Sequence, residues 1–201
     1  MSLDNTNLIL PDYIASSADH ITAEMRKVSE PLLFPLSFED KKNIDILSRK
    51  FDEAENCVGL AAPQIGIFKR AIVFAVPDDP ALKKWRKNLE QTIAKTIWLN
   101  PSYASISAET YEDYEACFSI LNTAVLVRRY KKIEYTAYDL DGNLIKGTAE
   151  GFLARLMQHE IDHLDGKFFV DNVKKENIMS MEEYKEKRTK AFESINQENA
   201  Q

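Results

Sequence analysis

The chain has 201 residues, of which 44% are hydrophobic and 29% are charged, and its formal net charge is −6. This composition is typical of a globular protein, and the length predicts a single domain over residues 1–201 with a buried core. The acidic balance and the lack of any long basic run argue against a nucleic-acid-binding surface. The sequence has no apolar run long enough to span a membrane and no signal-peptide core, so we expect a cytoplasmic protein.

The first quarter of the chain predicts an extended segment followed by two helices. Residues 1–16 are the expected extended lead-in, and residues 17–29 are predicted to form a short helix. Ser37 before an acidic first turn is typical of a helix N-cap. Apolar residues then recur at helical spacing, which predicts a second helix over residues 38–55 that packs against the core.

Strands dominate the middle of the chain. Residues 71–76 are continuously apolar and predict a buried strand, whereas residues 77–93 are a polar insertion with a short helix. Further strands are predicted at residues 96–100, 110–114, 124–129, 132–140 and 144–148. Asp141-Gly142 is typical of a tight turn and predicts that the last two strands form a hairpin. We therefore expect an α+β fold built on antiparallel sheets.

The C-terminal segment, residues 175–201, predicts a helix with a frayed tail. Ser180 and Glu183 have the spacing of a capping box, and mixed charges follow them along the chain. Balanced charges favour a solvated face, and a docking element for a partner is the alternative.

The most informative stretch is His159-Glu160-Ile161-Asp162-His163, because it contains two of the three histidines in the chain. A spacing of four residues is little more than one helical turn, so His159 and His163 lie on one face of a helix. Two imidazoles in this arrangement bind one transition metal, with Glu160 beside them to move protons. Apolar residues over 152–164, followed by Gly166, predict a metal-binding helix that ends at this glycine.

The alternative is an ordinary amphipathic helix that carries two polar histidines. It is disfavoured because the histidines fall on or beside the apolar face, where unpaired polar groups are costly.

A catalytic zinc-like site also needs a third protein ligand. The candidates are His20, Cys57, Cys117 and a downstream carboxylate such as Glu182, and composition does not choose among them. Two cysteines fit a reducing compartment rather than a disulfide framework.

Three separated stretches resemble the motifs of the peptide deformylase family. Val58-Gly59-Leu60-Ala61-Ala62-Pro63-Gln64 resembles Gly-x-Gly-Leu-Ala-Ala-x-Gln. Glu115-Ala116-Cys117-Phe118-Ser119 resembles Glu-Gly-Cys-Leu-Ser, and the stretch from Gln158 to Gly166 resembles Gln-His-Glu-x-Asp-His-Leu-x-Gly. Because the order and rough spacing also agree, the chain is identified as a divergent member, with similarity over residues 8–173.

The resemblance implies a metal-dependent hydrolase that removes the N-formyl group from the N-terminal formyl-methionine of nascent polypeptides and releases formate. It implies that Cys117, His159 and His163 hold one divalent metal ion, Fe²⁺ in cells, with Zn²⁺, Ni²⁺ or Co²⁺ as alternatives. Glu160 then takes a proton from water and passes it to the leaving amine. The Gln64 side chain and the Phe118 backbone N–H donate to the developing oxyanion.

The resemblance also implies how a substrate is held. Its peptide adds as a strand between the first and second motifs, contacting Val58, Gly59, Leu60 and Ala116. Glu115 and Arg129 are implied as a pair that supports the metal ligands. The implied partners are N-formylated nascent peptides, with a transient ribosome contact in a bacterial cytoplasm and with neither nucleic acid nor membrane bound.

Several positions depart from the family pattern. Cys57 and Ala116 replace glycines, Phe118 replaces leucine, and Leu121, Ala124 and Arg128 also differ. These positions cluster where a substrate is gripped, so they bear on substrate preference and rate rather than on reaction type. Cys57 is either a small buried filler or an oxidisable thiol.

Two other functions compete with this interpretation. One is a zinc metallopeptidase with a downstream glutamate ligand. The other is a non-catalytic peptide-binding paralogue, against which the presence of Glu160 argues.

Overall fold

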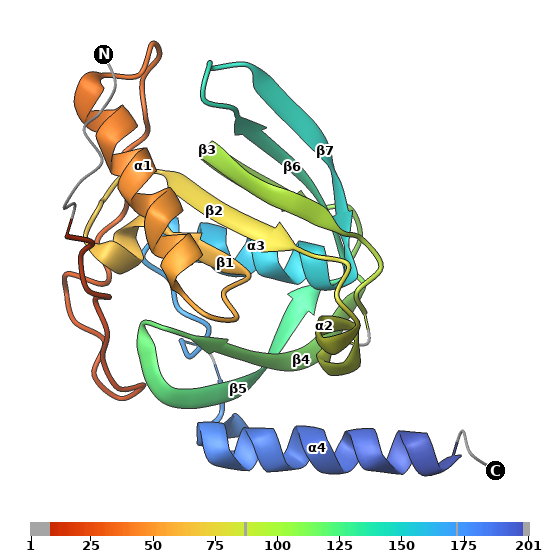
Figure 1. Cartoon of the computed structure of the whole chain (residues 1–201). Coiled ribbons are helices and arrows are strands. Elements are labelled where there is room, and N and C mark those ends of the chain that lie inside the picture. The colour runs from red at the N-terminus through yellow and green to blue at the C-terminus, as the bar shows by residue number, and fades with distance from the viewer. Residues whose placement is uncertain (1–8, 87, 172, 199–201) are drawn as a thin grey trace.

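Two antiparallel sheets surround one helix, α3 (Gly151–Leu164), in the computed structural model (Figure 1). The structure describes residues 9–86, 88–171 and 173–198. The first sheet has the strand order β1 (Gly59–Ala61), β2 (Ala71–Val76), β3 (Ile93–Ser105), β6 (Lys132–Tyr138) and β7 (Leu144–Glu150). The second has the order β4 (Thr110–Cys117), β5 (Ile120–Tyr130) and β8 (Ile178–Met179). This arrangement confirms the predicted α+β fold with antiparallel sheets around the histidine-bearing helix.

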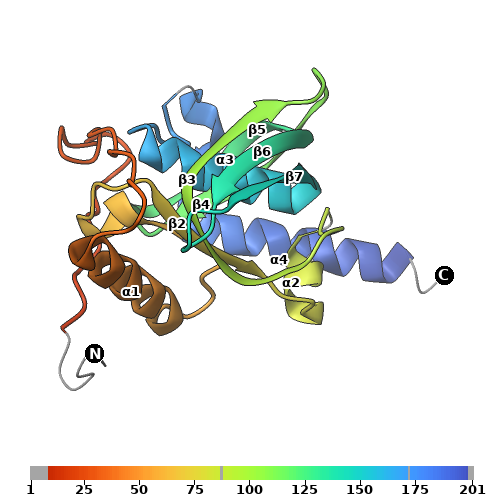
Figure 2. The same ribbon diagram turned by 90° about the horizontal axis from the view of Figure 1, so that it is seen from above.

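Strand β2 is buried on both faces because helices cover both sides of the first sheet. Successive side chains of a strand point to opposite faces. Ile72 and Phe74 therefore pack with the α3 side of the core, whereas Ala71 and Val73 pack with the side formed by α1 (Phe38–Glu53). Seen from above, α1 and α3 lie on opposite sides of the sheet (Figure 2). This double burial explains why residues 71–76 are continuously apolar.

Local signals set the ends of the two buried helices. Ser37 Oγ accepts a hydrogen bond of 3.0 Å from the Asp40 N–H, and the Asp40 carboxylate accepts from the Ser37 N–H in return. This capping box starts α1 where the sequence predicts. Helix α3 is followed by Gly166, whose φ is +68°, and an ideal Cβ there would lie 2.7 Å from the Arg26 carbonyl carbon. Only glycine fits this position, so the predicted helix end is confirmed.

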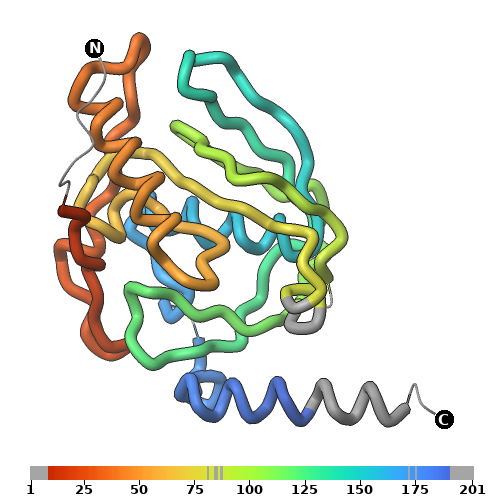
Figure 3. Tube along the Cα trace, in the orientation of Figure 1, coloured from red at the N-terminus to blue at the C-terminus, as the bar shows by residue number. Residues whose placement is uncertain are grey.

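The first segment of the chain differs from the prediction. Residues 17–29 form turns rather than a helix, and long-range backbone hydrogen bonds hold both ends of this segment. The Ser16 N–H donates to Ser119 O over 3.0 Å, and the Ser29 N–H donates to Leu164 O over 2.8 Å. The chain therefore runs beside the β4–β5 turn and the end of α3 (Figure 3). Residues 1–8 of the predicted lead-in lie outside the described residues.

The remaining elements lie at the periphery. Helix α2 (Pro80–Trp85) is the short helix predicted in the insertion. Helix α4 (Met181–Glu198) begins after Ser180, whose hydroxyl and N–H both bond the Glu183 carboxylate. It runs along the outside of the second sheet (Figure 1), and an ion pair between Arg188 and Asp113 attaches it to β4. Two 3-10 helices, η1 (Ala62–Ile65) and η2 (Lys175–Asn177), complete the described chain. Among the described helices, none combines the length and apolarity that crossing a membrane requires.

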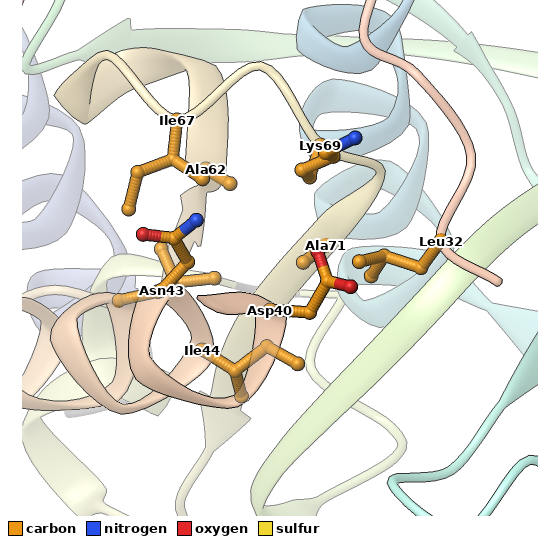
Figure 4. Close-up of a pocket in the computed structure, with 9 residues that line it drawn as sticks. Leu32, Asp40, Asn43, Ile44, Ala62, Ile67, Lys69 and Ala71 are labelled. Carbon is orange, nitrogen blue, oxygen red and sulfur yellow. The ribbon is translucent and has the colours of Figure 1, made fainter. Parts of the chain in front are cut away.

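A small pocket lies between α1 and the segment that follows η1 (Figure 4). Its volume is about 10 Å³, which is room for about one water molecule. The residues around it are mostly apolar: Leu32, Asp40, Asn43, Ile44, Leu47, Ala62, Ile67, Lys69 and Ala71. None of them belongs to α3 or β4, so this pocket is separate from the histidines.

Candidate metal centre

Three ligand atoms from two elements converge beside α3. The Cys117 sulfur lies 3.3 Å from His163 Nε2, which lies 3.2 Å from His159 Nε2. These side chains form a metal-ligand group whose atoms lie within 4.8 Å of one another. Zinc bonds of about 2.0–2.3 Å place tetrahedral donors roughly 3.3–3.7 Å apart. One sulfur and two imidazoles at these separations fit a divalent transition metal.

Two local features of the fold bring these ligands together. One helical turn of α3 separates His159 from His163, and their rings meet edge to face with centroids 4.8 Å apart. Cys117 ends β4, at the point where the pairing register with β5 shifts. Such irregularities redirect a side chain. Of the four candidates for the third ligand, the structure brings Cys117 to the histidines, and the group found among the described residues does not include His20, Cys57 or Glu182.

Protonation in the centre follows from burial. Burial lowers the pKa of His163 well below its usual value, which favours the neutral imidazole that metals bind. Burial acts in the same direction on His159, but its hydrogen bonds with Cys117 and Glu115 raise that pKa well above its usual value. A proton therefore competes with a metal ion at His159. His163 Nδ1 is buried and has no hydrogen-bond partner among the described residues.

Glu160 lies beside the ligands in a tight space. Burial raises the pKa of Glu160 to about 7. Its Oε2 atom is buried and finds no hydrogen-bond partner in the described part of the chain. An ideal Cβ on Gly59 would lie 2.8 Å from the Glu160 carboxyl carbon, so the missing side chain of Gly59 makes room for this carboxylate.

Glu115 is the central carboxylate of a buried cluster of charged side chains next to the ligand His159. It accepts hydrogen bonds of 3.0 Å from two nitrogens of Arg129 and one of 2.6 Å from Arg155, while its Oε2 lies 2.9 Å from His159 Nδ1. Burial by itself would raise the pKa of Glu115, but Arg129 and His159 hold it well below its usual value. Because the Glu115 carboxylate bonds to Nδ1 of His159, the Nε2 atom of the same ring remains available to bind a metal.

Sequence reasoning missed three members of this cluster. Arg155 is 2% exposed, Asp162 pairs with Arg129, and the Tyr103 hydroxyl lies 3.5 Å from Asp162. A signal for Arg155 was present, because an arginine within an apolar helical stripe needs a buried partner. Tyr103 belongs to a distant strand, β3, and carries no comparable signal.

Gln64 and Phe118 lie on the Cys117 side of the centre. Gln64 is buried, and its Nε2 donates to the Cys117 sulfur over 3.1 Å and to Ser119 Oγ over 3.3 Å. Its Oε1 accepts from the Ala61 N–H over 2.8 Å, which fixes the orientation of the amide. The Phe118 side chain is 39% exposed, and its ring stacks on Tyr13 with centroids 4.9 Å apart.

The predicted substrate residues lie on two facing motifs with different exposure. Val58 and Gly59 are half-buried and Ala116 is exposed, whereas the Leu60 side chain is fully buried on the α1 side of the core. Of the departing positions, Leu121 and Arg128 are exposed and Ala124 is buried. They do not enter the metal-ligand group.

Cys57 is held as a neutral thiol. Its sulfur donates to the Gly59 carbonyl over 3.2 Å. Burial, with a smaller contribution from Glu160, raises the pKa of Cys57 to about 12. Since the thiolate is the reactive form, this environment favours a buried filler over an oxidisable thiol.

Comparisons with known proteins agree with this geometry. The family model described as polypeptide deformylase matches residues 15–178. Peptide deformylase 2 of Rickettsia conorii is 51% identical over 197 residues, which cover 96% of this chain and 98% of that protein. The peptide deformylase of Dictyoglomus thermophilum is 36% identical over 165 residues, or 79% of this chain and 97% of its own length.

Solved structures share the fold. A class I type b peptide deformylase from Acinetobacter baumannii, solved with Met-Ala-Ser bound, superposes with a TM-score of 0.70 at 24% identity, covering 82% of this chain and 99% of that one. The peptide deformylase of Ehrlichia chaffeensis gives a TM-score of 0.67 at 24% identity and covers 95% of this chain and 97% of its own.

Proposed function

The chain belongs to the polypeptide deformylase family and is a metal-dependent hydrolase, and we propose on this premise that it removes the N-formyl group from the formyl-methionine of nascent polypeptides. The observation that carries the proposal is the convergence of Cys117, His159 and His163 with Glu160 beside them. Formate and a free N-terminus are the products. The substrate places the enzyme in the cytoplasm, in transient contact with the translating ribosome.

The metal is one divalent ion held by Cys117, His159 and His163, with Fe²⁺ as the ion in cells and Zn²⁺, Ni²⁺ or Co²⁺ as alternatives. When bound, such an ion acts as a Lewis acid that polarises a carbonyl group and makes water more acidic. Gln64 and the Ser119 N–H, which lies 3.4 Å from the Cys117 sulfur, donate to it and stabilise its thiolate form.

Glu160 is the general base and then the general acid. It accepts a proton from the attacking water and returns it to the nitrogen that leaves as the free amine. A pKa near 7 suits both steps, because the carboxylate is available near neutral pH and the carboxylic acid is not too weak a donor.

Two donors stabilise the charge that develops on the formyl oxygen. They are Gln64 Nε2, which lies 3.1 Å from the Cys117 sulfur, and the backbone N–H of Phe118, the residue after Cys117. The hydrogen bond from the Ala61 N–H to Gln64 Oε1 holds the amide in a fixed orientation before the reaction, which is what makes such donors effective.

The substrate peptide pairs with two free strand edges. Strand β1 ends the first sheet and β4 ends the second, so each has one edge with which no described strand pairs. Gly59 on β1 lies against Glu160, and Ala116 on β4 precedes the ligand Cys117. A peptide added between these edges gains main-chain hydrogen bonds and presents its formyl group to the centre.

Formate release tests the proposal. Purified protein, loaded with metal under anaerobic conditions, is incubated with formyl-methionyl peptides, and formate is measured. Release that requires both the metal and Cys117 is the expected result, with Cys117→Ser losing metal and activity together. Cleavage of internal peptide bonds without formate release would instead indicate a metallopeptidase.

A further inference from the structure

Arg155 is a buried arginine on the metal helix, one turn before His159. Its side chain is 2% exposed and crosses from α3 to the second sheet. Its Nη1 donates to Glu115 Oε1 over 2.6 Å, and its Nη2 donates to the carbonyl oxygens of Tyr111 and Val127, each over 3.0 Å. These acceptors belong to β4 or β5, as does the Asp113 carbonyl oxygen, which lies 3.4 Å from Nη1.

These contacts join the two elements that carry the metal ligands. Helix α3 supplies His159 and His163, and strand β4 supplies Cys117. Glu115, two residues before Cys117, bonds both Arg155 and His159, which are four residues apart on α3. We propose that Arg155 is a positioning residue that fixes α3 against β4, so that the histidine nitrogens and the cysteine sulfur are held at metal-binding separations.

Position 155 requires the planar, forked shape of a guanidinium group. Its planar fork donates to a carboxylate and to two carbonyls at once, which a single ammonium group cannot do with the same geometry. Arg129 is shared between the buried Glu115 and the part-buried Asp162, so Arg155 supplies the second positive charge that these two carboxylates need. An apolar residue at position 155 would leave the carbonyl oxygens of Tyr111 and Val127 and one oxygen of Glu115 without the hydrogen bonds that Arg155 donates.

The positive charge of Arg155 weakens metal binding, whereas its positioning effect strengthens it. A buried cation near the centre repels a metal ion, so removing its charge would by itself tighten metal binding. Arg155→Lys keeps the charge and loses the fork, and it is therefore the decisive variant. Arg155→Met removes both and measures the sum of the two effects.

Arg86 provides a matched control. Its Nη1 donates to the Tyr114 carbonyl on the same strand β4 over 2.9 Å, and its guanidinium lies 5.0 Å from the ring of Phe152 on α3. It thus links the same two elements, but it donates hydrogen bonds to Asp113 and Tyr114 rather than to Glu115. Arg86→Lys tests whether any arginine between α3 and β4 has the same effect.

The experiment measures the Kd of Zn²⁺ by chelator competition and the thiolate absorption of the Co²⁺ form. It also measures the Tm with and without metal. We expect Arg155→Lys to weaken Zn²⁺ binding by about tenfold and Arg155→Met by about 10–100-fold. The rise in Tm on adding metal should shrink accordingly, and the Co²⁺ spectrum should change. Arg86→Lys should keep the wild-type Kd.

Three results would overturn the proposal. The first is a wild-type Kd and Co²⁺ spectrum in the folded Arg155 variants, with Tm lowered equally in the metal-free and metal-loaded forms. The second is an equal loss of affinity in Arg86→Lys. The third is failure of both Arg155 variants to fold with metal, which would assign Arg155 to folding alone. None of these measurements depends on formate release, so they stand apart from the proposed substrate.

Discussion

Gly59 and Glu160 occupy adjoining space: an ideal Cβ on Gly59 would lie 2.8 Å from the carboxyl carbon of Glu160. Glycine at this position therefore determines where the carboxylate sits. If residue 59 gains a side chain, the Glu160 carboxylate must move, and so must Leu156 Cδ1, which would lie 2.7 Å from the same Cβ.

Gly59→Ala should displace Glu160 and lower kcat by at least roughly tenfold, since a general base must stay within hydrogen-bond reach of its proton. The measurements are formate-release kinetics and Tm. Gly147→Ala on β7 is the control, because its Cβ would meet the Tyr135 side chain at 2.7 Å, away from the centre. Both variants should lose stability, and only Gly59→Ala should lose turnover. A wild-type kcat in Gly59→Ala would show that the carboxylate position is not critical.

Glu160→Ala should keep its metal and lose roughly 10²–10⁴ in turnover, the usual contribution of a positioned acid–base group. The physical reason is that Glu160 follows the ligand His159 in the chain without being part of the metal-ligand group. Metal content and formate release are measured on the same preparation. Turnover near the wild-type value would remove Glu160 from the mechanism.

The activity should fall on the acidic side with the titration of Glu160. Burial raises the pKa of this residue to about 7, and the base must be ionised to accept a proton. A bound cation nearby favours the carboxylate and moves the midpoint downward. We therefore expect kcat/KM to rise with pH and to level off, with a midpoint at or below about 7. Metal content must be checked at each pH, because protons also compete at His159. Glu160→Gln should abolish this limb, and an unchanged profile in that variant would assign it to another group.

The sequence predicted the parts of the fold that are encoded locally. The Ser37 cap and the apolar spacing after it define α1, and the four-residue spacing of His159 and His163 defines one face of α3. The helix predicted at residues 17–29 is wrong because tertiary hydrogen bonds, such as Ser29 N–H to Leu164 O, outweigh a weak local preference.

The choice of the third ligand required three-dimensional information. Cys57 and Cys117 are the same residue type, and only the fold shows that Cys117, at the register shift that ends β4, lies with the histidines. The motif resemblance supplied this choice before the geometry did. Arg155 carried a readable signal, but its partner Glu115 lies on another element, so its role could be assigned only from the fold.

Ala116→Gly tests the most prominent departure on the substrate side. Ala116 is exposed on strand β4, next to the ligand Cys117, so its methyl group borders the space assigned to the substrate. Removing this methyl should raise kcat/KM for formyl-methionyl peptides, mainly through a lower KM, because the peptide backbone approaches the strand more closely.

The variant should also lose some stability, about 0.5–1 kcal/mol, because glycine has more conformational freedom in the unfolded chain. Ala104→Gly on β3 is the control, since Ala104 is an exposed strand alanine paired with Glu134 on β6. It should show the stability loss without the kinetic gain. Steady-state kinetics at matched metal content separate the outcomes. If Ala116→Gly lowers Tm like the control and leaves kcat/KM unchanged, the methyl does not crowd the peptide, and this edge of β4 is suited to the substrate as it stands.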